Sequence, residues 1–189
     1  MWNLPNVLTL SRLVLTGVFL YLLTLESKPW GHDAAVVVLL LAGLTDLLDG
    51  WLARRWNICT AFGRMADPLM DKVLICGGFI YFFSYHDNLV PFWVVMVVVG
   101  RELVVTAMRF YVESLGAKFA ATVFGKSKMA VQFATLCYFT IYLGHYTGVD
   151  LATNIAHVLV WVMAIVTLLS AVPYALQAGT LLRKPGADA

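Results

Sequence analysis

Apolar stretches alternate with short polar segments along the whole chain. A helix that crosses a bilayer needs roughly 20 residues at ~1.5 Å each, so the shorter stretches must include polar neighbours to reach that length. The pattern predicts six transmembrane helices with short connections, and therefore one domain over residues 1–189 without a soluble appendage. The apolar runs cover residues 7–25, 34–53, 73–85, 91–100, 129–144 and 155–176.

Composition agrees with this interpretation. Of the 189 residues, 61% are hydrophobic and only 13% are charged. A soluble domain of this length has too little interior to bury so much apolar surface. We therefore predict an all-α integral membrane protein. Its expected surroundings are the lipid bilayer, and we expect no nucleic-acid partner.

The basic residues predict the orientation. If the N-terminus is cytoplasmic, Lys28 is the one basic residue of 13 that falls in an external loop, which is a strong positive-inside signal even though Arg12 and Arg101 lie within spans. This orientation predicts a multi-pass protein of the inner (cytoplasmic) membrane. A cleaved secretory signal fits the first 25 residues less well, because Arg12 interrupts the apolar run and no A-x-A site follows.

The second predicted span contains two aspartates, although a carboxylate at that depth costs several kcal/mol. The stretch LTDLLDGWLARRW covers residues 44–56. Asp46, Asp49 and Ala53 lie on one helix face. The small residues Gly50 and Ala53 on that side would let a bulky ligand approach the backbone closely.

The third predicted span adds two more aspartates. Asp67 followed by Pro68 predicts a helix start, with Asp67 as the N-cap and Pro68 at the first helical position. Asp71 comes one turn later on the same side. If the second and third helices form an antiparallel hairpin, four carboxylates converge near the cytoplasmic interface.

Four close, partly desolvated carboxylates could not all stay ionised without a compensating positive charge. Because the ligands are all oxygens, and Cys59, Cys76 and Cys137 have no ligand spacing, Mg²⁺ or Mn²⁺ is favoured over zinc. Two such ions would suit phosphoryl-group chemistry. The structural alternative is that Asp46 pairs with Arg101 and that Asp67 only caps a helix.

The aspartates belong to a longer pattern, which resembles position by position the signature of the CDP-alcohol phosphatidyltransferase family. The segments at residues 5–12, 100–109 and 125–132 look like the branch of this family whose acceptor is glycerol 3-phosphate. The similarity reaches to about residue 132, and the remainder matches only as apolar helices. The signature reads Asp46-x2-Asp49-Gly50-x2-Ala53-Arg54-x8-Gly63-x3-Asp67-x3-Asp71.

The resemblance implies a role for each signature residue. The four aspartates would hold one or two divalent metals, Mg²⁺ or Mn²⁺, on the diphosphate of CDP-diacylglycerol, and Asp71 would also take the proton from the attacking hydroxyl. The family also implies a homodimer. The residues implied to bind the CDP-lipid are Asn6, Thr9, Gly50, Ala53, Arg54, Thr60 and Gly63.

Four cations outside the signature suggest the acceptor site. Arg101 lies near mid-membrane, where an unpaired guanidinium is costly, and Arg109 follows two turns later. Lys126 and Lys128 open the fifth helix at the depth of the aspartates. Arg109 and Lys128 could instead be snorkelling anchors, but a pocket for the phosphate of an anionic acceptor explains all four. With the branch resemblance, this favours glycerol 3-phosphate as acceptor, with phosphatidylglycerophosphate and CMP as products.

Other functions stay open at this point. The same family includes enzymes for other acceptors, such as inositol phosphate, or phosphatidylglycerol in cardiolipin synthesis. A membrane prenyltransferase also binds a diphosphate through metal-bridging aspartates, although usually on distant helices. An ion-coupled transporter is a third alternative, which the lack of a visible inverted repeat disfavours.

Overall fold

The computed structural model describes residues 4–25, 29–56, 61–86, 89–114 and 123–183. Within these ranges the side chains at 4–10, 49–56 and 61–71, and at a few other positions, lie outside the description. The described residues form six α-helices and no strand, which confirms the predicted all-α class and the number of helices. These helices are α1 (Leu4–Leu23), α2 (Pro29–Trp56), α3 (Ala61–Tyr85), α4 (Phe92–Ser114), α5 (Val123–His145) and α6 (Asp150–Arg183).

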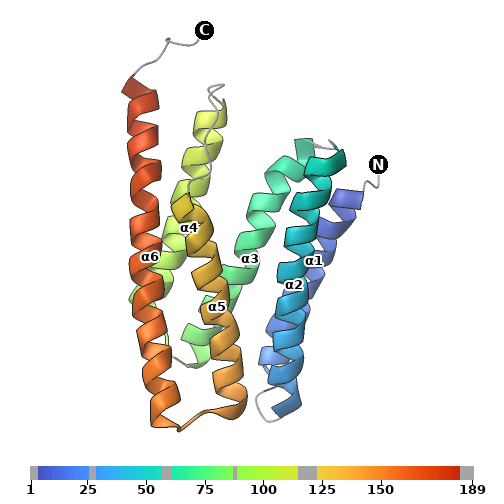
Figure 1. The fold of residues 1–189 in the computed structure, drawn as a ribbon, viewed down its shortest axis with the longest axis vertical. Helices are drawn as coiled ribbons and strands as arrows, with labels where there is room; N and C mark the ends of the chain where they lie inside the picture. The colour runs from blue at the N-terminus through green and yellow to red at the C-terminus, as the bar shows by residue number, and fades with distance from the viewer. Residues whose placement is uncertain (1–3, 26–28, 57–60, 87–88, 115–122, 184–189) are drawn as a thin grey trace.

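Successive helices run in alternating directions (Figure 1). The start of α1, the facing ends of α2 and α3, the end of α4 and the end of α6 lie toward one end of the bundle, which we call the N-terminal end. Helix α1 packs against both α2 and α3, while α5 packs against α2, α3 and α6, and α4 packs against α3 and α6. The arrangement brings the two aspartate-bearing helix ends together.

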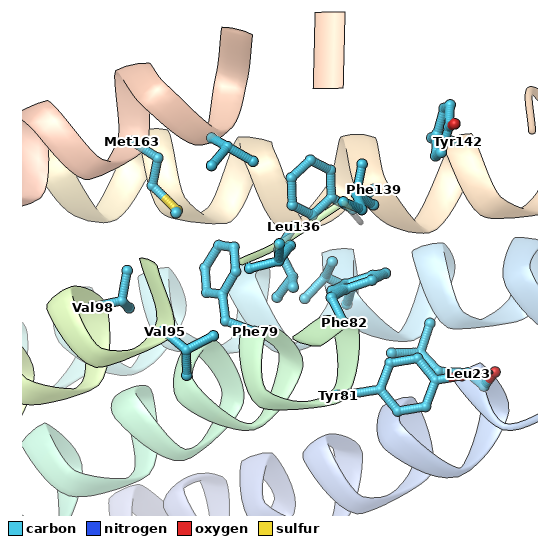
Figure 2. Close-up of a cluster of buried hydrophobic side chains, with 14 of the residues drawn as sticks. Leu23, Phe79, Tyr81, Phe82, Val95, Val98, Leu136, Phe139, Tyr142 and Met163 are labelled. Carbon is cyan, nitrogen blue, oxygen red and sulfur yellow. Dashed lines mark hydrogen bonds between the residues drawn. The ribbon is translucent and has the colours of Figure 1, made fainter. Parts of the chain in front are cut away.

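The hydrophobic core lies where α3 faces α5 (Figure 2). Phe139 of α5 makes edge-on contacts with Phe79 and Phe82 of α3, with ring centroids 6.3 and 5.4 Å apart. Gly78 permits this approach, because a Cβ atom there would lie 2.5 Å from Cδ1 of Leu136. The core therefore fixes α3 against α5, the helices that carry Asp71 and Lys128.

Polar side chains are buried inside the bundle while large apolar side chains cover its outside. On α5, the fully or almost fully buried residues Lys128, Gln132 and Thr135 follow one helix face, and Gln132 donates to the hydroxyl of Thr167 at 3.2 Å. The exposed face of α6 has the opposite character, with apolar residues at helical spacing. Its members are Leu151, Ile155, Val158, Trp161, Val162, Ile165, Leu168, Leu169, Val172 and Leu176.

Within the residues that the structure describes, one stretch, Asp150–Leu176, is long and apolar enough by itself to cross a membrane, and Ser11–Leu23 and Lys72–Tyr85 are shorter apolar stretches.

The predicted start of the third helix is wrong. Helix α3 begins at Ala61, so Asp67 and Pro68 lie inside the helix and Asp67 is not its N-cap. Proline removes one backbone hydrogen bond from a helix interior, but the residues before it include the good helix formers Ala, Arg and Met. The aspartates of α3 are therefore positioned by a continuous helix and not by a capped end.

Candidate active site

The four predicted metal ligands lie on two helices whose connected ends meet. Asp46 and Asp49 belong to α2, and Asp67 and Asp71 belong to α3. Figure 1 shows these two helices converging at the N-terminal end, with α1 beside them. The side chains of Asp49, Asp67 and Asp71 lie outside the described residues, so the structure gives the side-chain geometry of Asp46 alone.

Asp46 is held by an arginine from α1. The Arg12 side chain, only 3% exposed, places Nη2 2.9 Å from Oδ1 of Asp46, whose side chain is 38% exposed. One turn later in α1, the hydroxyl of Thr16 donates to the backbone carbonyl of Arg12 at 2.9 Å, a contact that does not involve the guanidinium. Arg101, the partner considered for Asp46 from sequence, makes different contacts. The first helix thus orients one carboxylate of the signature.

The described part of the site is compatible with a hard divalent cation. The ion pair engages Oδ1 of Asp46, and Oδ2 of the same half-exposed carboxylate is an oxygen donor of the kind that Mg²⁺ and Mn²⁺ prefer. Among the described side chains alone there is no group of three metal-ligating residues, and the other three aspartates lie outside that set. The metal ligands stay a prediction.

A second cluster of charges is built around Glu102 of α4. This buried carboxylate receives a hydrogen bond from the ammonium of Lys128 on α5. Its other oxygen lies 3.8 Å from Nζ of Lys72 on α3. Lys72 also donates to the hydroxyl of Thr106, which donates to the backbone carbonyl of Glu102 at 2.6 Å. One glutamate therefore joins α3, α4 and α5.

Arg101 contributes a third cation to this cluster. Its Nη1 lies 3.4 Å from Oε1 of Glu102, and its guanidinium lies over the ring of Tyr174 on α6, 5.4 Å from the ring centroid. The side chain is 8% exposed. Its Nε and Nη2 are buried and have no hydrogen-bond partner within the described part of the chain. Arg101 thus has donors left over for a ligand.

Arg109 adds to the excess of positive charge. It lies two turns beyond Arg101 on α4, is half-buried, and has an Nε that is buried without a hydrogen-bond partner among the described residues. It is within electrostatic range of Lys72. Three described cations, Lys72, Arg101 and Lys128, thus contact the carboxylate of Glu102, and Arg109 follows on the same helix. This excess of positive charge favours binding of an anion with more than one negative charge.

The predicted acceptor residues are brought together in part. Arg101 and Lys128 share Glu102, and Arg109 lies on the same helix as Arg101. Lys126 lies in the first turn of α5, but its side chain is outside the described residues. The acceptor role of these four residues stays a prediction.

For the residues predicted to bind the CDP-lipid, Thr60 apart, the structure gives the helix on which each lies but not the position of its side chain. Asn6 and Thr9 lie in α1, Gly63 lies in α3, and Gly50, Ala53 and Arg54 lie in α2. The side chains at these positions lie outside the described residues, as does the whole of Thr60. Their roles stay predictions.

Sequence reasoning missed three residues of these clusters: Arg12, Lys72 and Glu102. Arg12 gave a signal, because a cation within an apolar run needs a partner. Glu102 directly follows Arg101, and because neighbouring helix positions differ by about 100°, the sequence alone does not indicate that the two pair; the long arginine side chain spans that angle. Lys72, directly after Asp71, gave no separate signal.

Comparison with known proteins agrees with the family resemblance. The model of a family described as CDP-alcohol phosphatidyltransferase matches residues 2–170. The chain is similar to a CDP-diacylglycerol--glycerol-3-phosphate 3-phosphatidyltransferase from Bacillus subtilis, with 35% identity over 70% of this chain and 73% of the relative. Proteins with the same name match from Haemophilus influenzae, with 30% identity over 92% and 91% of the two chains, and from Escherichia coli, with 32% identity over 72% and 76%.

Proposed function

Because the chain belongs to the CDP-alcohol phosphatidyltransferase family, we propose that it transfers the phosphatidyl group of CDP-diacylglycerol to glycerol 3-phosphate, giving phosphatidylglycerophosphate and CMP. The names of the relatives from Bacillus subtilis, Haemophilus influenzae and Escherichia coli support this reaction.

The observation that favours a phosphorylated acceptor is the excess of cations around Glu102, and the names of the relatives favour glycerol 3-phosphate among such acceptors. Choline would bring a further positive charge to Lys72, Arg101 and Lys128, and serine, a zwitterion, would bring no net negative charge to balance them. The phosphate of glycerol 3-phosphate would instead accept from the unused donors of Arg101 and Arg109. Lys72 directly follows Asp71 in α3, so this anion site adjoins the proposed reaction centre.

The reaction requires a base, a neutralised diphosphate and an in-line displacement. Asp71 accepts the proton of the attacking glycerol hydroxyl. The hydroxyl oxygen then forms a bond to the phosphorus that carries the diacylglycerol, and the bond from this phosphorus to the CMP oxygen breaks. Asp46, Asp49, Asp67 and Asp71 would hold one or two divalent cations, Mg²⁺ or Mn²⁺, which would neutralise the diphosphate and stabilise the leaving CMP.

The signature surrounds the nucleotide with small and polar residues. Gly50, Ala53 and Gly63 leave room for it at the helix backbones. Arg54 and Thr60 would contact its phosphates or cytidine, and Asn6 and Thr9 would close the pocket from α1. Arg12 keeps Asp46 oriented in the same region.

We also propose that the single domain of residues 1–189 spans the inner membrane six times, with the N-terminus and the site cytoplasmic, and that it forms a homodimer. The apolar outer face of α6 and the buried polar residues of α5 support a bilayer environment, since soluble monomers rarely expose large contiguous apolar patches. The basic residues near the N-terminal end support the orientation.

An acceptor panel tests the function. Purified protein receives CDP-diacylglycerol and Mg²⁺ with glycerol 3-phosphate, inositol phosphate, phosphatidylglycerol or serine, and CMP release is measured. We expect release with glycerol 3-phosphate, its loss on chelation with EDTA, and its recovery with added Mg²⁺. CMP release with inositol phosphate and not with glycerol 3-phosphate would contradict the proposed acceptor. CMP release that is unchanged by EDTA would contradict the proposed need for a metal ion.

The base assignment is tested in the same assay. Asp71→Asn keeps the shape of the side chain but cannot take the proton, so CMP release should fall by roughly 10²–10⁴-fold. Binding of CDP-diacylglycerol by the variant should persist. Undiminished turnover would contradict the assignment.

A further inference from the structure

Glu102 is the buried carboxylate on which three of the described cations meet. It is 3% exposed and lies on α4, between Lys72 of α3 and Lys128 of α5. A buried carboxylate is costly unless it is paired and hydrogen-bonded. Here both oxygens face ammonium groups, so the pairing is complete. The cations, which outnumber it, are the part of the cluster that is left uncompensated.

Glu102 also determines which edge of the Arg101 guanidinium stays available to bind a ligand. The carboxylate contacts Nη1, whereas Nε and Nη2 are the buried atoms without a hydrogen-bond partner among the described residues. In a guanidinium group, Nε and Nη2 point their hydrogens to the same side, and this edge is a bidentate donor for two oxygens of one phosphate. The ring of Tyr174 supports the guanidinium from its face.

The lysines need Glu102 to stay where they are. Lys72 and Lys128 carry flexible four-carbon stems, and two ammonium groups near each other repel. The carboxylate between them, with the Thr106 hydroxyl on Lys72, holds both near Arg101. Without it we expect both lysines to turn toward the end of the bundle, because long cationic side chains extend to water when they can.

We propose that Glu102 is a positioning residue for the acceptor phosphate. It holds Lys72 and Lys128 in place and engages Nη1 of Arg101, so that the Nε–Nη2 edge of Arg101 and the two ammonium groups form a preorganised phosphate site. This proposal rests on the proposed function, since it assumes an acceptor that carries a phosphate. It adds Lys72 as a phosphate-binding residue beside Arg101 and Lys128.

The experiment measures the KM for each substrate and kcat in variants of the full-length protein. Glu102→Gln keeps the size of the side chain and removes its charge, so we expect the KM for glycerol 3-phosphate to rise about tenfold, equivalent to ~1.4 kcal/mol of acceptor binding. The KM for CDP-diacylglycerol should change little. Glu102→Asp keeps the charge on a shorter stem and should raise the acceptor KM by a smaller factor.

A double variant shows whether Glu102 acts through Lys128. Lys128→Met should raise the acceptor KM by itself, and Glu102→Gln added to it should have a smaller effect than in the unmodified protein. Thr140→Val is the matched control, because Thr140 is a fully buried polar residue of α5 whose hydroxyl donates within its own helix, at 2.9 Å to the Leu136 carbonyl. It should leave both KM values unchanged.

The outcomes separate the two proposals. If the unmodified protein releases no CMP with glycerol 3-phosphate, the proposed function fails. If it does release CMP, an unchanged or lowered acceptor KM in Glu102→Gln overturns the positioning role, as does an equal rise in both KM values. Thermal unfolding in detergent identifies variants that do not fold. Should Glu102→Gln be one of them, an unchanged acceptor KM in Glu102→Asp overturns the proposal equally.

Discussion

Arg12 is almost completely buried, and its contact with Asp46 connects the first helix to the aspartate signature. Asp46 is half-exposed, so water reaches one side of the carboxylate while the guanidinium fixes the other. A charge-assisted hydrogen bond of this kind contributes more than a neutral one. The pair therefore gives α1 a part in the geometry of the proposed metal site.

Replacing Arg12 should damage both stability and activity. Arg12→Gln leaves Asp46 without its ionic partner, and we expect a loss of about 1.5–3 kcal/mol in the free energy of unfolding, the range for hydrogen bonds to charged groups. CMP release should fall because the carboxylate is no longer oriented. Thermal unfolding in detergent and the CMP assay measure the two effects.

Thr16→Val is the control for this prediction. It removes a buried polar group one turn away, whose hydroxyl donates to the Arg12 carbonyl of its own helix, and leaves the ion pair in place. Its effect on CMP release should be much smaller. If Arg12→Gln behaves like this control in both measurements, the Arg12–Asp46 pair has no role in the site.

For single residues, the sequence indicated which charged side chains need a partner better than it indicated which partner each one has. Asp46 and Arg101 lie within apolar runs, which indicated that each needs a compensating charge. Which charges meet depends on how the helices are rotated against one another, and a single sequence does not determine this. Arg101 therefore meets Glu102 and Tyr174, and Asp46 meets Arg12.

Helices were predictable as elements but not at their ends. Six apolar runs gave six helices, because burial of apolar residues dominates where the runs are long. The polar segment between the second and third runs, residues 54–72, has no such periodicity, and α3 begins at Ala61, before the expected Asp67. Pro68 suggested a helix start, but here it lies within a helix that packs against α1, α4 and α5.

Close packing of α3 on α5 depends on Gly78. A Cβ atom at this position would meet Cδ1 and Cδ2 of Leu136 at 2.5 and 3.0 Å, and Leu136 is itself completely buried. Gly78→Val should therefore destabilise the protein by about 1–3 kcal/mol, the usual cost of overpacking a core. Chemical or thermal unfolding in detergent measures the change.

Gly17→Val is the matched control for Gly78→Val. Gly17 lies in α1, and a Cβ atom there has nothing within 4 Å. The same substitution should be close to neutral at this position, because it changes helix propensity by less than about 1 kcal/mol. Adding Leu136→Ala should recover part of the stability lost in Gly78→Val. Equal effects of the two valine variants would mean that helix contact is not the cause.

The molecule as a whole separates apolar and charged surfaces along two directions. Around the bundle, apolar side chains face outward, as the exposed face of α6 shows, while Glu102, Lys128 and Gln132 are buried. Along the bundle, the proposed orientation puts twelve of the 13 basic residues at or toward the cytoplasmic side. The apolar outer surface suits a surrounding lipid phase, and the uneven distribution of basic residues along the bundle favours one orientation in the membrane.

Cysteine labelling in cells tests this direction. The three native cysteines are first replaced, and single cysteines are introduced at exposed residues near opposite ends of the bundle: Tyr146 after α5, and Ser114 at the end of α4. A membrane-impermeant maleimide should label Tyr146→Cys in spheroplasts, and Ser114→Cys only after the membrane is opened. The physical reason is the cost of moving many cationic side chains across the bilayer, which keeps the basic end inside. Labelling of Ser114→Cys in intact spheroplasts would show that the orientation is opposite to the proposed one. The site would then face away from the glycerol 3-phosphate of the cytoplasm.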